Sequence, residues 1–173
     1  MLRYWLVLAV SVCASVTDLR WRRVPNLLVA AGLAAALAVA AAGGCLFGSL
    51  VRMALTAAAG LVLWRLRMLG AGDVKLAAFM AAALKLEEFL ICVSCGLIVG
   101  AVMSAVTMLV HGSFAARMSY FVSWLKRCAA QGSVQPYMES AQYGPENTIP
   151  FSAALAAGCA VGLLVLRIIR GGV

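Results

Sequence analysis

Long apolar runs separated by short polar turns dominate the pattern along this chain. Six runs rich in Ala, Leu and Val stand out, and the fourth is short for a bilayer, which a helix crosses with about 20 residues. Continuous apolar runs predict helices, because a membrane-spanning barrel would need apolar and polar residues to alternate. The pattern therefore predicts an all-α membrane protein with about six transmembrane helices. The predicted spans cover residues 4–17, 26–42, 46–66, 74–84, 89–110 and 149–167.

The connection before the last run, residues 111–148, contains one further periodic segment. Phe114, Met118, Phe121 and Leu125 recur at helical spacing, with basic residues around them. This combination is typical of an amphipathic helix that lies in the membrane interface. The remainder of the connection is rich in glycine, proline and polar residues and predicts an irregular loop.

Composition supports a membrane protein of one domain. Apolar residues make up 65% of the chain and charged residues 12%, with a mean hydropathy of +1.02, whereas a soluble domain is about half apolar and about a quarter charged. The predicted spans leave no room for a separate soluble domain, so we expect one integral-membrane domain over residues 1–173. The first run resembles a signal peptide, but it leads directly into Asp18 and a basic turn, which favours a retained helix.

The net charge of +8 follows the predicted membrane topology. The basic residues are dispersed at the ends of apolar runs, so we do not expect nucleic acid as a partner. Basic residues are enriched on the cytoplasmic side of membrane proteins. Nine basic residues fall on one predicted side: Arg20, Arg22, Arg23, Arg65, Arg67, Lys75, Arg117, Lys126 and Arg127. Five fall on the other: Arg3, Arg52, Lys85, Arg167 and Arg170. The first turn is therefore predicted to be cytoplasmic, with both termini outside.

The six cysteines predict packing rather than metal or disulfide chemistry. Cys13, Cys92, Cys95 and Cys159 lie within apolar runs, where cysteine is usually a small buried residue. Cys92 and Cys95 form a C-x-x-C, but no second pair completes a zinc site. The only histidine, His111, lies beyond the fifth run. We therefore expect neither a metal site nor a cofactor.

The six acidic residues divide into two groups by their place in the pattern. Glu87, Glu88, Glu139 and Glu146 fall in predicted loops or span ends, where solvated side chains are usual.

Asp18 and Asp73 each lie at the predicted cytoplasmic end of a span. An ionisable group beside a membrane segment is costly to keep, so each is a functional candidate. Taken singly, each could instead cap a helix or pair with a neighbouring arginine. Together they form a carboxyl pair of the kind that aspartyl proteolysis needs, in which one acid holds a proton while the other activates a water.

Each aspartate has a distinctive sequence around it. Asp73 lies in Gly70-Ala71-Gly72-Asp73-Val74-Lys75-Leu76, and Asp18 precedes Val24-Pro25-Asn26. The glycines are expected to let the backbone bend and another chain approach. Pro25 fixes the backbone dihedral at the start of the second span, and Asn26 can satisfy free backbone groups there. On a helix, the side chain of Lys75 would diverge from that of Asp73.

Together these segments resemble the prepilin peptidase family of G-x-G-D membrane aspartyl proteases. Ile149-Pro150-Phe151, at the start of the last run, is similar to a Pro-aromatic pair of that family. The resemblance implies a catalytic dyad of Asp18 and Asp73. It also implies supporting motif residues, namely Gly70, Gly72, Lys75, Pro25, Asn26 and Pro150.

The same resemblance implies a substrate and a location. The substrates would be prepilin or pseudopilin precursors, cut after a glycine between a short basic leader and an apolar helix. Cleavage would take place at the cytoplasmic face of the bacterial inner membrane, among membrane lipids and without a cofactor.

The chain departs from the larger family members at two places. It lacks their cysteine-bearing insertion between the first two spans, so N-methyltransferase activity is not expected. The compact form resembles the peptidases that serve tight-adherence (Flp-type) pili. After Phe151 the chain continues with Ser152 and Ala153, where many larger members have Gly-Pro.

Two other functions fit the same residues. An ion-coupled transporter or channel subunit could use the aspartates as a proton relay, although transporters more often show repeats and broken helices near the midplane. A catalytically inactive pilus-assembly subunit could retain both aspartates, and only activity would distinguish it.

Overall fold

The computed structural model describes residues 2–21, 24–132 and 151–171, and every regular element within these ranges is an α-helix. The predicted all-α class is therefore confirmed for the described residues. In chain order the helices are α1 (Leu2–Trp21), α2 (Asn26–Ala42), α3 (Leu46–Arg65), α4 (Ala71–Ala83), α5 (Leu86–Val110), α6 (Phe114–Gln131) and α7 (Phe151–Gly171).

Helices form at all six predicted spans, but they differ in length. Among the described residues, α1, α3, α5 and α7 are long and apolar enough to cross a membrane. The apolar α2 has 17 residues and α4 has 13, so both are short for a full crossing. The helical nature of these segments is confirmed, and the count of six spans stays a prediction.

The outer surface of the bundle is strongly apolar. Many large apolar side chains on it are more than half exposed, among them Leu27, Phe47, Leu55, Ile98 and Leu109. Exposed apolar area on this scale is rare in soluble monomers. It is the surface expected of helices that face lipid.

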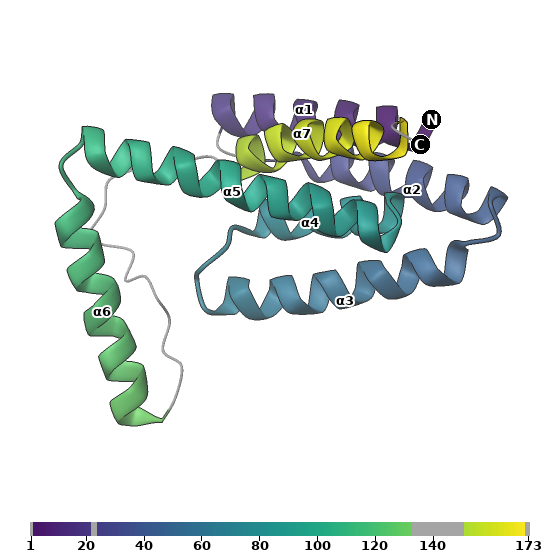
Figure 1. Cartoon of the computed structure of the whole chain (residues 1–173). Coiled ribbons are helices and arrows are strands. Elements are labelled where there is room, and N and C mark those ends of the chain that lie inside the picture. Colours follow the sequence, from purple (N-terminus) through teal and green to yellow (C-terminus); the bar gives the residue numbers. More distant parts are fainter. Residues whose placement is uncertain (1, 22–23, 133–150, 172–173) are drawn as a thin grey trace.

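Helix α4 lies at the centre of the bundle formed by α1 to α5 and α7. It contacts each of the other five helices, and Figure 1 shows it between α3 on one side and α1 and α7 on the other. Its Leu76, Phe79 and Met80 are fully buried, and Val7 and Ala14 of α1 belong to the same core. The helix that carries Asp73 is thus enclosed by protein rather than by lipid.

Helices α5 and α7 approach backbone to backbone. A Cβ atom placed on Gly158 would lie 2.1 Å from the Cα atom of Gly96, and one on Gly162 would lie 2.9 Å from the Cα atom of Cys92. Small residues permit such close helix pairs in membranes. This contact fixes the position of α7, whose first turn reaches the candidate site described below.

The cysteines are free thiols: two are buried, two are exposed, and Cys95 and Cys128 are half-buried. Cys92 and Cys159 are fully buried where α5 meets α7, which confirms the packing prediction for these two. For Cys13 that prediction is wrong: the side chain is exposed, because it projects from the outer face of α1 rather than into the core.

The amphipathic segment before the last span does form a helix, α6, so that part of the prediction is confirmed. Figure 1 shows α6 running across the direction of the other helices, at the end where α5 stops. Phe114, Met118, Phe121 and Leu125 are exposed on it. A helix across the bundle at one end has the direction expected of one lying in the membrane plane, and its place in the interface stays a prediction.

Candidate active site

The two aspartates occupy the same end of the bundle. Asp18 lies in the last turn of α1, and Asp73 lies in the first turn of α4. Helix α1 contacts α4, and the negative charge of Asp18 helps to raise the pKa of Asp73. Two side chains far apart in the sequence are therefore within electrostatic reach of each other.

Asp73 sits in surroundings that favour its neutral form. The carboxyl precedes the apolar part of α4, which begins at Val74. Burial is the main cause that raises its pKa, and the charge of Asp18 is the second, while a hydrogen bond with the backbone of Gly70 acts in the opposite direction. The net effect raises the pKa of Asp73 from 3.8 to about 6.

The hydrogen bond with Gly70 relates to the other role expected for Asp73, that of capping a helix. Gly70 is the N-cap residue of α4, so Asp73 bonds the backbone at the helix start. A carboxyl three residues into a helix commonly makes this bond. Asp73 therefore assists the start of α4 and at the same time lies within electrostatic reach of Asp18.

Asp18 is held by the first turn of α7. The hydroxyl of Ser152 donates a hydrogen bond to Oδ2 of Asp18, with 2.5 Å between the oxygens. The carbonyl oxygen of Ser152 in turn accepts a hydrogen bond of 3.0 Å from the hydroxyl of Ser15 on α1. Sequence reasoning missed Ser152, and the only signal was its place directly after Phe151.

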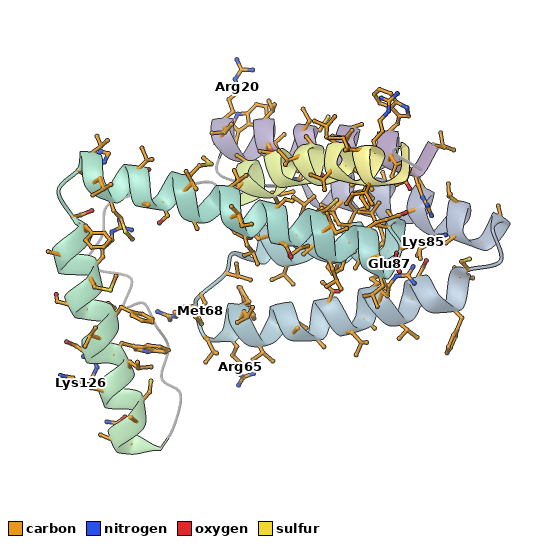
Figure 2. The ribbon with its side chains drawn as sticks, viewed as in Figure 1. Arg20, Arg65, Met68, Lys85, Glu87 and Lys126 are labelled. Carbon is orange, nitrogen blue, oxygen red and sulfur yellow. The ribbon has the colours of Figure 1, made fainter. Side chains whose placement is uncertain are left out.

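The sequence also allowed Asp18 to pair with a neighbouring arginine in the basic turn after α1. Arg20 is exposed, and Figure 2 shows it pointing away from the bundle. Its guanidinium lies over the ring of Trp21, 6.0 Å from the ring centre. Arg22 and Arg23 lie outside the described residues.

The glycines of the G-x-G-D segment serve close contacts rather than an unusual backbone. Gly70 has φ −74°, and neither Gly70 nor Gly72 has a positive φ, so the backbone conformation alone does not require glycine at either position. A Cβ atom on Gly70 would lie 2.9 Å from Oδ2 of Asp73. A Cβ atom on Gly72 would lie 3.0 Å from Cγ2 of Val24. Because these glycines have no side chain, there is room for the Asp73 carboxyl at Gly70 and for the segment that leads into α2 at Gly72.

Pro25, Asn26 and Lys75 join the two sequence segments. Pro25 is the N-cap of α2 with φ −61°, which confirms its expected place at that helix start. Asn26 was expected to satisfy backbone groups, but its side-chain oxygen instead accepts a 2.8 Å hydrogen bond from the ammonium of Lys75. Lys75 is thus directed to α2. Pro150 lies outside the described residues.

Glu88 corrects the expectation that the glutamates are solvated. Its side chain is fully buried. One carboxylate oxygen accepts hydrogen bonds from Arg3 at 3.0 Å and from the Tyr4 hydroxyl at 2.8 Å, and the other accepts one from the backbone N–H of Lys85 at 3.1 Å. These bonds tie the start of α1 to the start of α5. Glu87 is exposed as expected, and Glu139 and Glu146 lie outside the described residues.

The charged side chains mark two opposite ends of the bundle. Figure 2 shows Arg20 and Arg65 at the end where α1 stops and α4 begins, with Lys126 on α6 beyond it, and Lys85 and Glu87 at the other end. For these residues the grouping follows the division expected from the sequence. Which end faces the cytoplasm stays a prediction.

The chemistry that this site offers is that of two carboxyls with unequal surroundings. In residues 2–21, 24–132 and 151–171, no three His, Cys, Asp or Glu side chains gather into a group that could hold a metal ion. A half-buried acid with a raised pKa beside a second acid can donate and accept protons in one reaction. Such pairs are candidate functional sites on physical grounds.

Fold and site together define a helical membrane protein with a carboxyl pair at one end of its bundle. Residues 5–105, which include Asp18 and Asp73, match the model of the type IV leader peptidase family. The chain belongs to this family, whose members are prepilin peptidases, and its long apolar helices make it a multi-pass membrane protein. No curated protein and no solved structure matches the chain.

Proposed function

We propose that this protein is an aspartic endopeptidase that removes the short basic leader from Flp-type prepilins at the cytoplasmic face of the bacterial inner membrane. Asp18 and Asp73 form its catalytic pair, and residues 1–173 act as one peptidase domain. The observation that carries this function is the coupling of the two carboxyls, in which burial and the charge of Asp18 raise the pKa of Asp73. Membership of the leader peptidase family supports the reaction class.

The pair divides the chemistry between its two members. Asp73 is neutral and donates a hydrogen bond to the oxygen of the scissile carbonyl. Asp18 is charged and takes a proton from a water, whose oxygen attacks the carbonyl carbon. As the C–N bond of the tetrahedral intermediate breaks, Asp18 returns that proton to the leaving nitrogen. Neither a metal nor a covalent intermediate takes part.

The substrate class follows from the membrane setting of the pair. A prepilin has an apolar helix directly after its cleavage site, and that helix enters the same bilayer as the apolar outer surface of this bundle. The scissile bond then lies near the membrane surface, at the level of a bundle end. The basic residues at this end, including Arg20 and Arg65, favour the cytoplasmic side.

The Flp-type assignment rests on the compact sequence. Residues 22–25 separate α1 from α2, so no cysteine-bearing insertion lies between them. For the same reason, N-methylation does not belong to the proposed activity. No observation favours a transporter, because both aspartates lie at helix ends rather than midway along the helices.

Co-expression with a Flp-type prepilin tests this function. The wild-type protein should yield mature pilin, visible as a size shift on a gel, with a new N-terminus directly after the leader glycine by mass spectrometry. Asp18→Asn and Asp73→Asn should each lower the cleavage rate by about a hundredfold or more. Glu87→Gln is the matched control, because it changes an exposed acid at the other end of the bundle.

Two results would contradict the proposed function. Full cleavage by either aspartate variant would exclude the dyad. Failure of the wild type to cleave any of several well-expressed precursors would point to an inactive assembly subunit or to ion transport, which a proton-flux assay in vesicles would detect.

A further inference from the structure

Ser152 is a polar residue in an apolar stretch, and the family match does not reach it. It lies directly after Phe151, in the first turn of α7, whereas the matched range ends at residue 105. Its side chain is fully buried. A buried hydroxyl needs a partner, because leaving one without a hydrogen bond costs about 1–3 kcal/mol. Here that partner is a carboxylate of the proposed catalytic pair.

The backbone around Ser152 fixes its position. Its carbonyl oxygen accepts a hydrogen bond from Ser15, whose hydroxyl also lies 2.8 Å from the carbonyl oxygen of Ser11. Further along α7, Gly158 touches the backbone of α5 at Gly96. The Ser152 hydroxyl is therefore held against Asp18 by two neighbouring helices.

The other groups that face Asp18 come from the three helices packed against α1, which are α2, α4 and α7. Helix α4 brings Asp73 and Lys75, and the Lys75 ammonium is bonded to Asn26. The first turns of α2 and α7 contain no ionisable residue. On α1 itself, the side chain of Arg20 points away from the bundle. Of these groups, the Ser152 hydroxyl donates a hydrogen bond to the Asp18 carboxylate.

We propose that Ser152 is a positioning residue, whose hydroxyl orients the Asp18 carboxylate toward the water that attacks the scissile carbonyl. A hydrogen bond from a buried hydroxyl to one carboxylate oxygen is short and directional, so it restricts rotation of the carboxyl group. Ser152 therefore sets the geometry of the pair from the Asp18 side. This role rests on the proposed function.

The loss of the hydroxyl should change the reaction in a specific way. Ser152→Ala should lower kcat about tenfold or more, since hydrogen bonds to charged groups are the strong ones, and should leave KM nearly unchanged. Ser152→Thr, which keeps a hydroxyl, should restore most of kcat.

Ser15→Ala is the matched control for helix packing. It also removes a buried hydroxyl and one hydrogen bond between α1 and α7, but it leaves the bond to Asp18 in place. Purified full-length proteins in detergent, with a Flp-type prepilin as substrate, would give kcat and KM for each variant. Ser15→Ala should lower kcat much less than Ser152→Ala does, because the close contact of Gly158 with Gly96 still holds α7 in place. If Ser152→Ala does not fold, Ser152→Cys offers the same comparison, because its thiol is a weak donor.

The outcomes separate this role from the proposed function. A Ser152→Ala enzyme with wild-type kcat, alongside inactive Asp18→Asn and Asp73→Asn enzymes, would overturn the role of Ser152 alone. Equal losses of kcat in Ser152→Ala and Ser15→Ala would also overturn it, in favour of helix packing. Full activity of the aspartate variants would instead overturn the proposed function.

Discussion

The ammonium of Lys75 donates a 2.8 Å hydrogen bond to the side-chain oxygen of Asn26, and so joins the first turn of α4 to the first turn of α2. Val24, two residues before Asn26, lies against Gly72. The two sequence segments that carry the family resemblance are therefore one structural unit. Because the bond is exposed, we expect it to contribute at most about 1 kcal/mol, which suits a role in alignment rather than in the chemistry.

A double-mutant cycle would test this alignment. Lys75→Met and Asn26→Ala should each lower cleavage only a few-fold, because the aspartates remain in place. The double variant should be no slower than the slower single variant, since both remove one interaction. Cleavage rates of the purified proteins give the comparison. Additive losses would mean that the two residues act separately, and a loss as large as that of Asp73→Asn would mean that Lys75 takes a direct part.

The raised pKa of Asp73 predicts how cleavage depends on pH. Asp73 must be neutral to donate to the scissile carbonyl, and its pKa is about 6. The value of kcat/KM should therefore fall as the pH rises through about 6, because this quantity reports the free enzyme. A Glu87→Gln enzyme should show the same profile. A kcat/KM that stays constant well into the alkaline range would argue against a neutral Asp73 as the acid.

The same shift predicts that Asp73 costs stability at neutral pH. Its folded-state pKa of about 6 exceeds the ordinary value of 3.8, so its favourable contribution is fully present below about 3.8 and is lost as the pH rises through about 6. Asp73→Asn should therefore have a higher Tm than wild type at neutral pH, and the difference should shrink in acid. Thermal unfolding in detergent at several pH values would measure it. A lower Tm for Asp73→Asn at neutral pH would contradict this.

Gly70 predicts a loss of activity without a comparable loss of stability. In Gly70→Ala the new methyl group would lie 2.9 Å from Oδ2 of Asp73, so the carboxyl must move. A displacement of about 1 Å in a reacting group can cost about a hundredfold in rate. Gly43→Ala is the control, because Gly43 has an ordinary φ of −88° and only ordinary contacts there. If both variants keep wild-type kcat, the bare surface at Gly70 does not matter for the reaction.

Replacing Glu88 should have the opposite effect, namely a loss of stability without a loss of activity. Glu88→Ala leaves the hydrogen-bond donors of Arg3 and Tyr4 without their carboxylate, which should destabilise the protein by about 2–3 kcal/mol. The kcat of the folded fraction should stay unchanged, because this cluster lies at the other end of the bundle. Thermal unfolding and single-turnover cleavage on the same preparation would separate the two effects. A changed pH–rate profile would show that Glu88 influences the aspartates.

The sequence predicted best those features that depend on residues close together along the chain. Apolar runs predicted the helices, and the two motifs singled out Asp18 and Asp73, because helix formation and the cost of an acid beside lipid depend on nearby residues. Gly70 and Gly72 were recognised as important from the sequence, but the groups they make room for are set by tertiary contact and could not be named in advance.

Other residues could not have been found from the sequence. The bond between Ser152 and Asp18 exists only because α7 docks beside α1. The burial of Glu88 depends on Arg3 and Tyr4 at the start of a different helix. In both cases the partner is far away along the chain. Hydrophobic periodicity predicts which segments form helices, but it does not predict which helix ends come into contact.

The contact between Gly96 and Gly158 determines how this bundle can deform. No side chain lies between the two backbones there, so no change of rotamer can absorb a shift at that crossing. Ser152 precedes Gly158 by less than two helical turns and moves with it. A substitution or a lipid that disturbs this crossing should therefore displace α7 as a whole. The hydrogen bond between Ser152 and Asp18 would then be lost, although no residue at the site had changed.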